Sequence, residues 1–215
     1  MAQIFPRWTN ELPLRIAAAS IVVVGLLVGG IWYYFSPQYT DVGYQPVQPV
    51  AYSHKLHAGE LGINCMYCHA TVDRAPVAVV PPTQVCMNCH HVVKRDSVEL
   101  AAIRESSASG RPMQWVRVHN LPGYAYFDHR PHLRAGVGCA TCHGRIDQME
   151  VVELSQPLSM SWCLDCHRNP DPYLRLEQEV TTMDWSAPKD QFEFAARVKF
   201  EKQIRPPLDC TGCHR

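Results

Sequence analysis

Neither sign of charge is in excess in this sequence, whose 215 residues include 20 Lys and Arg against 20 Asp and Glu. The lack of a basic surplus argues against a nucleic-acid partner, because binding to a polyanion needs clustered positive charge. A charge-rich disordered protein is also excluded, because 47% of the residues are hydrophobic. Cysteine is absent outside one short motif, and that motif is the most informative feature of the sequence.

The motif is Cys-x-x-Cys-His, and it occurs five times, so that no cysteine is left over. In this spacing the two cysteines form thioethers to the vinyl groups of one haem and the histidine binds its iron as the proximal ligand. The cysteine pairs are Cys65 and Cys68, Cys86 and Cys89, Cys139 and Cys142, Cys163 and Cys166, and Cys210 and Cys213; the histidines are His69, His90, His143, His167 and His214. The sequence therefore predicts a multihaem c-type cytochrome with five covalently bound haems.

Two other uses of paired cysteines fit less well. Structural zinc sites do not require a histidine after every second cysteine, and five pairs do not make whole four-cysteine sites. A thioredoxin-like redox pair would be a single motif near a βαβ unit.

Six histidines lie outside the blocks and are available as distal ligands. His54 and His57 precede the first block in Tyr-Ser-His-Lys-Leu-His, and His129 and His132 precede the third in Phe-Asp-His-Arg-Pro-His. Two histidines three residues apart on one helical turn can serve two different haems, so we expect all four to bind iron. His119, in the spacer before the second pair, is a further predicted ligand. His91 directly follows a proximal histidine and is the least favoured, with a solvated side chain as the alternative.

Methionine is the other possible distal ligand, and it raises the reduction potential relative to a second histidine. The candidates lie beyond the second His-x-x-His pair, where no spare histidine is available: Met149, Met160 and Met183. We expect one of the three to bind iron, although gap-filling in an apolar site is the commoner use of methionine.

Residues 16–35 form an uncharged run whose length, at about 1.5 Å per residue, is close to the thickness of a bilayer core. A cleaved signal peptide usually has a shorter apolar region followed by small residues, whereas this run ends in aromatic side chains. Arg7 and Arg15 precede the run, and the next basic residue is Lys55. The prediction is a single-pass anchor in the cytoplasmic membrane, with residues 1–15 inside and the haem domain on the periplasmic face.

The outer segment provides roughly 36 residues for each haem, too few to build an independent apolar core. We therefore predict a mainly irregular and α-helical domain wrapped around its haems, with little or no sheet. Its expected parts are a Pro-rich tether at 36–50 and a haem domain at 51–215, divided into a first haem pair (51–100), a second pair (129–170) and a fifth haem (206–215). Short helices are expected at 94–106 and 190–203.

With these features the chain resembles the ActA-type pentahaem cytochrome subunits of alternative complex III. The segments that carry the resemblance are Phe127–His132 and Leu158–Arg168, and the His-x-x-His pairs are also similar to those of c3 and c7 cytochromes. The resemblance implies an electron-transfer subunit, not an enzyme by itself, in a menaquinol-oxidising respiratory complex. It also implies integral-membrane and peripheral partner subunits, contact with membrane lipid, and a monohaem cytochrome or other carrier as acceptor.

Two alternative functions remain in view. Small quinol dehydrogenases that feed periplasmic reductases also have one helix and four or five haems, but their family places a methionine where this sequence has Thr71. A multihaem reductase needs an iron open to substrate, often marked by lysine in place of the proximal histidine, and all five blocks here end in histidine.

Overall fold

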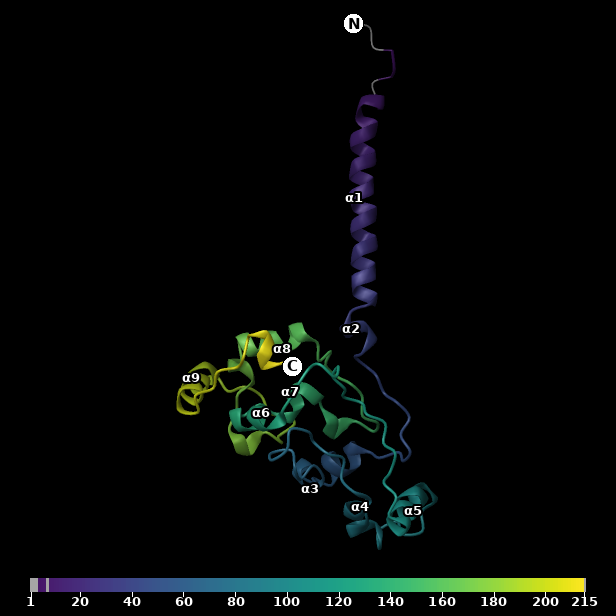
Figure 1. The fold of residues 1–215 in the computed structure, drawn as a ribbon, viewed down its shortest axis with the longest axis vertical. Coiled ribbons are helices and arrows are strands. Elements are labelled where there is room, and N and C mark those ends of the chain that lie inside the picture. The colour runs from purple at the N-terminus through teal and green to yellow at the C-terminus, as the bar shows by residue number, and fades with distance from the viewer. Residues whose placement is uncertain (1–3, 7, 215) are drawn as a thin grey trace. The chain divides into compact units, whose positions relative to one another are not determined.

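A computed structural model describes residues 4–6 and 8–214 of the chain, apart from the side chain of Gln38. The chain divides into two compact units, with the boundary between Asp41 and Val42. Each unit is described by itself (Figure 1).

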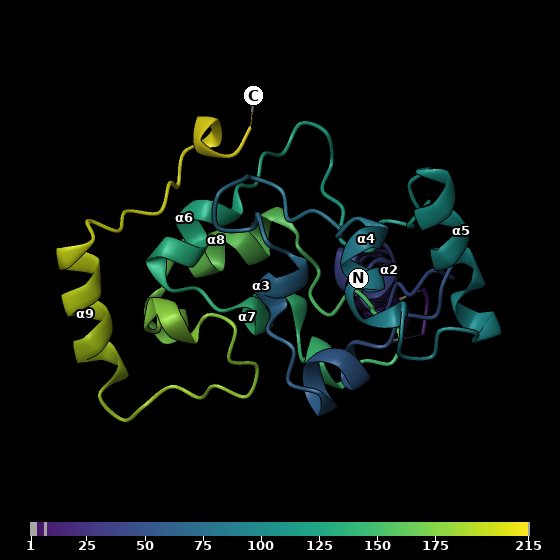
Figure 2. The same cartoon turned by 90° about the horizontal axis from the view of Figure 1, so that it is seen from below.

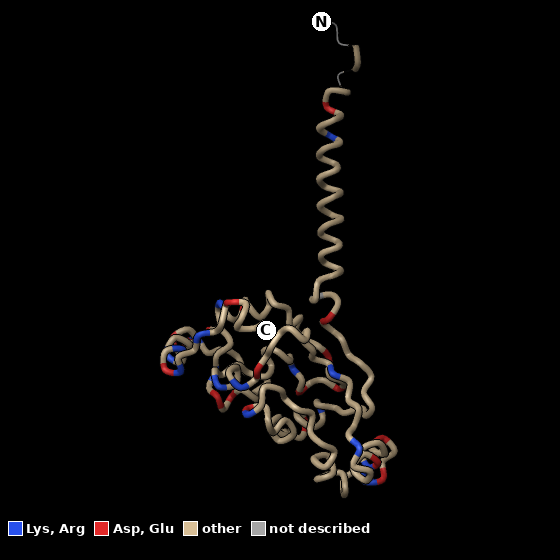
Figure 3. Tube along the Cα trace, in the orientation of Figure 1, with Lys and Arg blue, Asp and Glu red and all other residues tan. Residues whose placement is uncertain are grey.

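The first unit contains one long helix, α1 (Trp8–Tyr34), followed by the short α2 (Pro37–Thr40). The helix begins before the predicted run at 16, because Glu11 and Arg15 pair across one turn and extend it. After Arg15 no charged residue occurs along α1 (Figure 3). Its length and composition suffice to cross a membrane, and none of its residues is buried. Arg7, one of the two residues that orient the predicted anchor, lies outside the described residues.

The second unit is built from short helices joined by irregular segments. The α-helices are α3 (Cys65–Cys68), α4 (Thr83–His90), α5 (Ala101–Ser109), α6 (His129–Ala135), α7 (Cys139–His143), α8 (Met160–Arg168) and α9 (Gln191–Glu201). A π-helix, η1 (Lys55–Glu60), and the 3-10 turns η2 (Val98–Leu100), η3 (Ile146–Gln148), η4 (Asp171–Tyr173), η5 (Glu177–Glu179) and η6 (Cys210–Gly212) complete the list. Over residues 4–6 and 8–214 the β-structure amounts to two isolated bridges, Ala125 with His214 and Val137 with Leu174. The predicted fold class is confirmed.

Within this unit, α4 and α5 lie together at one end and α9 lies at the other, with α3 and α7 between them (Figure 2). The apolar core made by the polypeptide is small. Its centre is Val137, Leu174 and Ala195, and Leu174 is the largest side chain that is completely buried in the described part of the chain. So small a core supports the prediction that other groups supply most of the buried apolar surface.

Both predicted short helices exist, one of them displaced. The helix expected at 190–203 is α9. The helix expected at 94–106 begins only at Val98 and continues to Ser109. Lys94 has a φ of 49°, in the left-handed region, which prevents a right-handed helix from starting there. Gly110, with a φ of 71°, ends the helix and donates its backbone N–H to the carbonyl of Ser106.

The final part of the Pro-rich segment is attached to the second unit. The backbone N–H of Gly43 donates to the carbonyl of Leu154 at 2.8 Å, and that of Leu154 donates to the carbonyl of Tyr44 at 3.0 Å. The Gln48 side-chain amide makes hydrogen bonds to both the carbonyl and the N–H of Val116. Residues 43–48 therefore belong structurally to the domain that carries the Cys-x-x-Cys-His blocks.

Candidate functional site

Each Cys-x-x-Cys-His block occupies one helical turn or the end of a longer helix. The blocks are on α3, α4, α7, α8 and η6. Three of these elements begin at a side-chain cap, since Asn64, Ser159 and Asp209 accept hydrogen bonds from backbone N–H groups of the first turn. The helical turn sets the orientation of both cysteines and the following histidine, because residues three or four apart share one face.

The two His-x-x-His segments repeat each other in three dimensions. In the first, the Tyr52 ring packs against His54 and His57, with centroid distances of 4.7 and 4.5 Å. In the second, the Phe127 ring packs against His129 and His132 at 4.7 and 4.6 Å. An aromatic residue two positions before the first histidine therefore holds both imidazoles in each copy.

The second histidine of each pair is fixed in the same way. His57 donates from Nδ1 to the Ser53 carbonyl at 2.8 Å, and His132 donates to the Asp128 carbonyl at 2.7 Å. Both acceptors lie four residues earlier in the chain. A proton held on Nδ1 leaves the Nε2 lone pair free for a metal.

The same use of Nδ1 extends to most histidines of the blocks. The carbonyl partners of His69, His90, His167 and His214 are those of Val79, Val93, Pro207 and Tyr124. His129 bonds to the Pro76 carbonyl, which ties the second His-x-x-His segment to the first haem pair. Backbone carbonyls thus select the tautomer that can bind iron through Nε2.

Three pairs of imidazoles have a centroid spacing that would suit one iron between the two rings. Two metal–nitrogen bonds of about 2 Å, with half of each ring added, separate the centroids of two axial imidazoles by roughly 6 Å. The observed centroid distances are 6.1 Å for His57 and His90, 6.4 Å for His129 and His143, and 6.1 Å for His132 and His167. Each pair joins a predicted distal histidine to the histidine of one block.

His54 and His119 also lie close to block histidines, but neither forms a ring pair with the centroid spacing that an iron would need. Burial, followed by the nearby His69 and His57, lowers the pKa of His54 to about 4. The His119 ring lies only 4.3 Å from that of His143, too close to admit an iron between them. His54 Nδ1 and His119 Nε2 are buried without a hydrogen-bond partner in the described part of the chain. Each ring therefore has a nitrogen that no hydrogen bond occupies.

The third block is the most enclosed. Burial, together with the neighbouring imidazoles of His119 and His129, lowers the pKa of His143 to about 3. Burial also raises the pKa of Cys142 to about 12 and that of Cys139 to about 11. These values measure enclosure, because thioether formation removes both thiol protons. The neutral form of His143 is the form that binds metal.

The fifth block has a different environment. The ring of His214 lies 5.8 Å from that of Tyr124, and the bridge between Ala125 and His214 attaches this block to the spacer before the second pair. The structure therefore brings His119 to the third block and not to the fifth.

His91 is exposed and donates from Nδ1 to the carbonyl of Met87, which suits the alternative of a solvated side chain.

The three candidate methionines lie in different places. The Cε atom of Met149 lies beside Gly144, at the end of the third block. Met160 begins α8 with its side chain 64% exposed, one turn before Cys163. Met183 is half-buried and follows Thr182 in the segment after η5.

The blocks form a chain in space whose order differs from that in the sequence. Burial raises the pKa of seven cysteines, and for four of them a cysteine of another block raises the pKa further. These pairs are Cys68 with Cys86, Cys139 with Cys65, Cys142 with Cys166, and Cys163 with Cys213. The resulting order is second, first, third, fourth, fifth. Cys89 and Cys210, at the two ends of this order, are the exposed cysteines of the ten.

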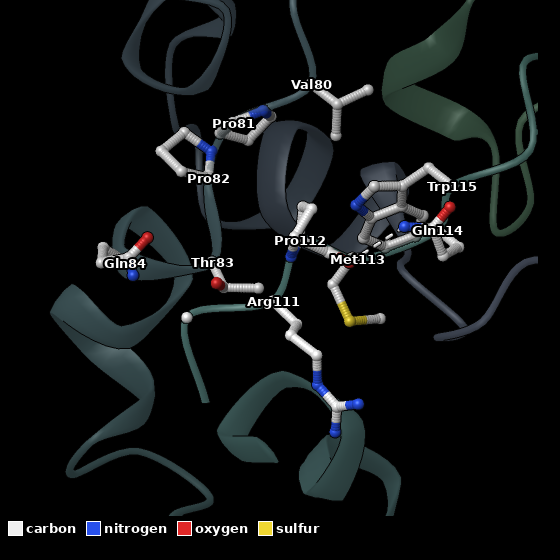
Figure 4. A pocket seen from close by; sticks show the side chains of 11 residues that line it. Val80, Pro81, Pro82, Thr83, Gln84, Arg111, Pro112, Met113, Gln114 and Trp115 are labelled. Carbon is white, nitrogen blue, oxygen red and sulfur yellow. Dashed lines mark hydrogen bonds between the residues drawn. The ribbon is translucent and has the colours of Figure 1, made fainter. Parts of the chain in front are cut away.

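A cavity of about 490 Å³ lies beside the second block, at one end of that order. Residues 80–84, which lead into α4, form one side, and residues 110–115, which follow α5, form the other (Figure 4). Met113 and Trp115 contribute apolar surface, and Thr83, Gln84 and Arg111 contribute polar groups. The lining contains no cysteine or histidine, so this space is separate from the haem-attachment residues.

The donor set therefore fits haem. Among the described residues no group of three or more His, Cys, Asp or Glu side chains is placed to hold a bare metal ion. Imidazoles instead lie in pairs near cysteine pairs, and these residues would hold a covalently attached haem iron between two histidines.

Comparison with known proteins agrees with this chemistry. Residues 131–215, which include the third, fourth and fifth blocks, match the family model described as Cytochrome c3. Over 122 residues the chain is 31% identical to the "Menaquinone reductase, multiheme cytochrome c subunit" of Nitratidesulfovibrio vulgaris (strain Hildenborough). The alignment covers 56% of this chain and 55% of that relative, so the chain spans about half the length of the curated relative it matches. Residues 131–215 are therefore similar to a cytochrome c3-type domain, a class of domain that binds several c-type haems covalently.

Proposed function

We propose that this protein is a membrane-anchored pentahaem cytochrome that conducts electrons within a menaquinol-oxidising respiratory complex of the alternative complex III type. The observation that carries the proposal is the linear order of the five blocks, with exposed cysteines at both ends and the most enclosed block in the middle. Such an order gives electrons one route between two surfaces. It requires no substrate pocket, so the chain acts as a subunit and not as an enzyme by itself.

When bound, each haem supplies an iron that alternates between the ferric and ferrous states. The chain's residues hold that iron in place. We propose His69, His90, His143, His167 and His214 as proximal ligands. The facing rings support His57, His129 and His132 as distal ligands to the second, third and fourth irons. The repeat assigns His54 to the first iron, in the position that His129 has for the third.

For the fifth iron we propose Met160. Cys163 lies near Cys213 of the fifth block, and Met160 precedes Cys163 by three residues on α8. Side chains three residues apart share a helix face, so Met160 is directed toward the same neighbour. Its exposure in the polypeptide leaves the sulfur free to bind. Met149 and Met183 are then packing residues.

The membrane part of the proposal rests on α1. Its apolar length suits a single span, and the basic Arg7 and Arg15 before it support an N-terminus in the cytoplasm. The haem domain would then face the periplasm and receive electrons from membrane-embedded or peripheral partner subunits. A monohaem cytochrome or other soluble carrier would accept them.

Two observations favour alternatives. The name of the relative describes menaquinone reduction, so the same haem series could carry electrons from a soluble donor toward the membrane. The cavity beside the second block has the volume of a small-molecule site, which would suit a quinol dehydrogenase acting without partners.

The test is quinol reduction of the haems, followed optically, in the chain purified alone and in its native membrane assembly. Dithionite gives the full reduction amplitude of each sample. We expect menaquinol to reduce the haems only in the assembly. Rapid reduction of the isolated chain would instead establish the dehydrogenase function. In a second assay the assembly receives menaquinone and a reduced soluble cytochrome. If quinol forms there, and menaquinol does not reduce the haems, the direction of electron flow is the reverse of the one proposed.

A further inference from the structure

Arg175 is a buried cation whose role the ligand set does not explain. Its side chain is 4% exposed, and it is the one Lys or Arg that is buried in the described part of the chain. Its Nη1 donates to the Thr182 carbonyl at 3.0 Å, and its Nη2 lies 3.4 Å from the Thr141 hydroxyl. The Trp185 ring covers the guanidinium, with its centroid 4.2 Å from Cζ.

The guanidinium lies against the third block. Thr141 is inside that block, between Cys139 and Cys142. A Cβ atom at Gly138, the residue before Cys139, would overlap the guanidinium of Arg175. Only glycine therefore allows the chain to enter α7 while the arginine occupies this place. Arg175 and Cys139 are close enough to affect each other's pKa electrostatically.

No carboxylate side chain in the described part of the chain neutralises this charge at contact distance. Among the described residues no carboxylate lies within the 4.0 Å of an ion pair, and the acidic group that faces it at longer range is Glu179. A buried cation with an unpaired Nε is costly to desolvate. Stability alone would favour an apolar side chain of similar volume here, so the retained charge points to another role.

We propose that Arg175 raises the reduction potential of the haem held by Cys139 and Cys142. The ferric haem carries one more positive charge than the ferrous haem, so a nearby buried cation disfavours the ferric state. The effect is large because the surroundings of the third block are the most enclosed and screen charge weakly. The inference rests on the proposed haem at this block, and it is independent of the proposed partners and direction of electron flow.

The experiment is a potentiometric titration of the membrane-anchored holoprotein in detergent, with the haem components resolved by EPR. Arg175→Met removes the charge at similar length, and Arg175→Gln is a second neutral variant that keeps a donor for Thr182. Arg175→Lys keeps the charge. Arg197→Met is the matched control, because Arg197 is an exposed arginine whose Cζ lies 5.6 Å from the Phe194 ring.

In a neutral variant we expect the equilibrium constant for reduction of one haem to fall about tenfold, a shift of about 59 mV for one electron. The other components stay unchanged, as do all components of Arg175→Lys and Arg197→Met. High ionic strength does not abolish the difference, because a buried charge is poorly screened. Intact mass counts the haems separately. Five haems with unchanged potentials in the neutral variants would overturn the role of Arg175, whereas fewer than five haems in the wild-type protein would overturn the proposed pentahaem function.

Discussion

The imidazole rings of His57, in η1, and His90, at the end of α4, lie with their centroids 6.1 Å apart and their planes at 61°. The Nδ1 atoms of both rings are engaged by backbone carbonyls, those of Ser53 and Val93. Their Nε2 atoms are therefore the ones available to one iron. Under the proposed function, this pairing makes the second haem the one that depends on His57.

Replacement of His57 by methionine should change one haem of the five. A His/Met iron has a higher reduction potential than a bis-His iron, so we expect one component to move upward by about tenfold in its reduction equilibrium, or about 59 mV. Potentiometric titration measures the shift. The control is His91→Met, which should leave all components in place because His91 is exposed. A shift in the control, with none in His57→Met, would exchange the roles of the two histidines.

Gly136 should be more sensitive to substitution than a glycine with open space around it. It ends α6 with a φ of 89°, and a Cβ there would overlap the carbonyl oxygen of Arg175. Gly110 provides the matched control, since its φ is 71° and a Cβ at that position would meet no other atom within 4 Å. We expect Gly110→Ala to cost about 1 kcal/mol for the left-handed conformation. Gly136→Ala should cost roughly 1–3 kcal/mol more because of the overlap.

Denaturant unfolding followed by haem-region circular dichroism compares the two glycine variants. Similar losses would mean that the close approach between Gly136 and Arg175 is relieved easily. The comparison also tests the bridge between Val137 and Leu174, which the overlap would separate.

The motifs could be predicted from the sequence because each is a local pattern. The five blocks, the two His-x-x-His segments and the helix at 191–201 depend on neighbouring residues. The packing of Tyr52 and Phe127 against the histidines was not predicted, although both residues belong to the repeated segments. Their equal placement, two positions before each histidine pair, is the signal that could have revealed it.

Long-range features could not be predicted in this way. The order of the blocks depends on how distant segments pack, as when the His129 Nδ1 bonds to Pro76. The place of His119 before the second repeat predicts a ligand, but its position next to His143 is set by tertiary structure. Arg175 belongs to no motif at all. Its importance follows from burial beside Gly138, which a single sequence does not reveal.

The N-terminus of α6 should be sensitive to acid through Asp128. Its carboxylate accepts from the Arg130 N–H at 2.9 Å and pairs with the Arg130 side chain, whose hydrogen bond lowers the Asp128 pKa to about 2. A lowered pKa in the folded state means that the stabilisation is present above about pH 4 and is lost as the pH falls toward 2. We expect Asp128→Ala to cost about 1 kcal/mol at pH 7.

Thermal unfolding between pH 2 and 7 measures how the Asp128→Ala deficit changes with pH. The deficit should shrink as the pH falls toward 2, because the wild-type carboxylate is then protonated as well. Asp128→Asn is the control, since asparagine also caps helices and should lose less stability. A deficit equal at both ends of the pH range would show that the charge of Asp128 contributes nothing.

Loss of an end haem should differ from loss of the middle one. The fifth block is exposed at Cys210 and lies at one end of the order, whereas the third block is enclosed and lies between the first and fourth blocks. We expect the double variant Cys210→Ala with Cys213→Ala to accumulate as a folded protein with four haems, counted by intact mass. The variant Cys139→Ala with Cys142→Ala should fail to accumulate, because the small apolar core around Val137 cannot replace the missing haem.

In the four-haem variant, a reductant whose electrons enter at the second haem should still reduce the remaining haems at the wild-type rate, since the lost haem lies at the far end. Slower reduction of those four haems would mean that electrons enter through the fifth block.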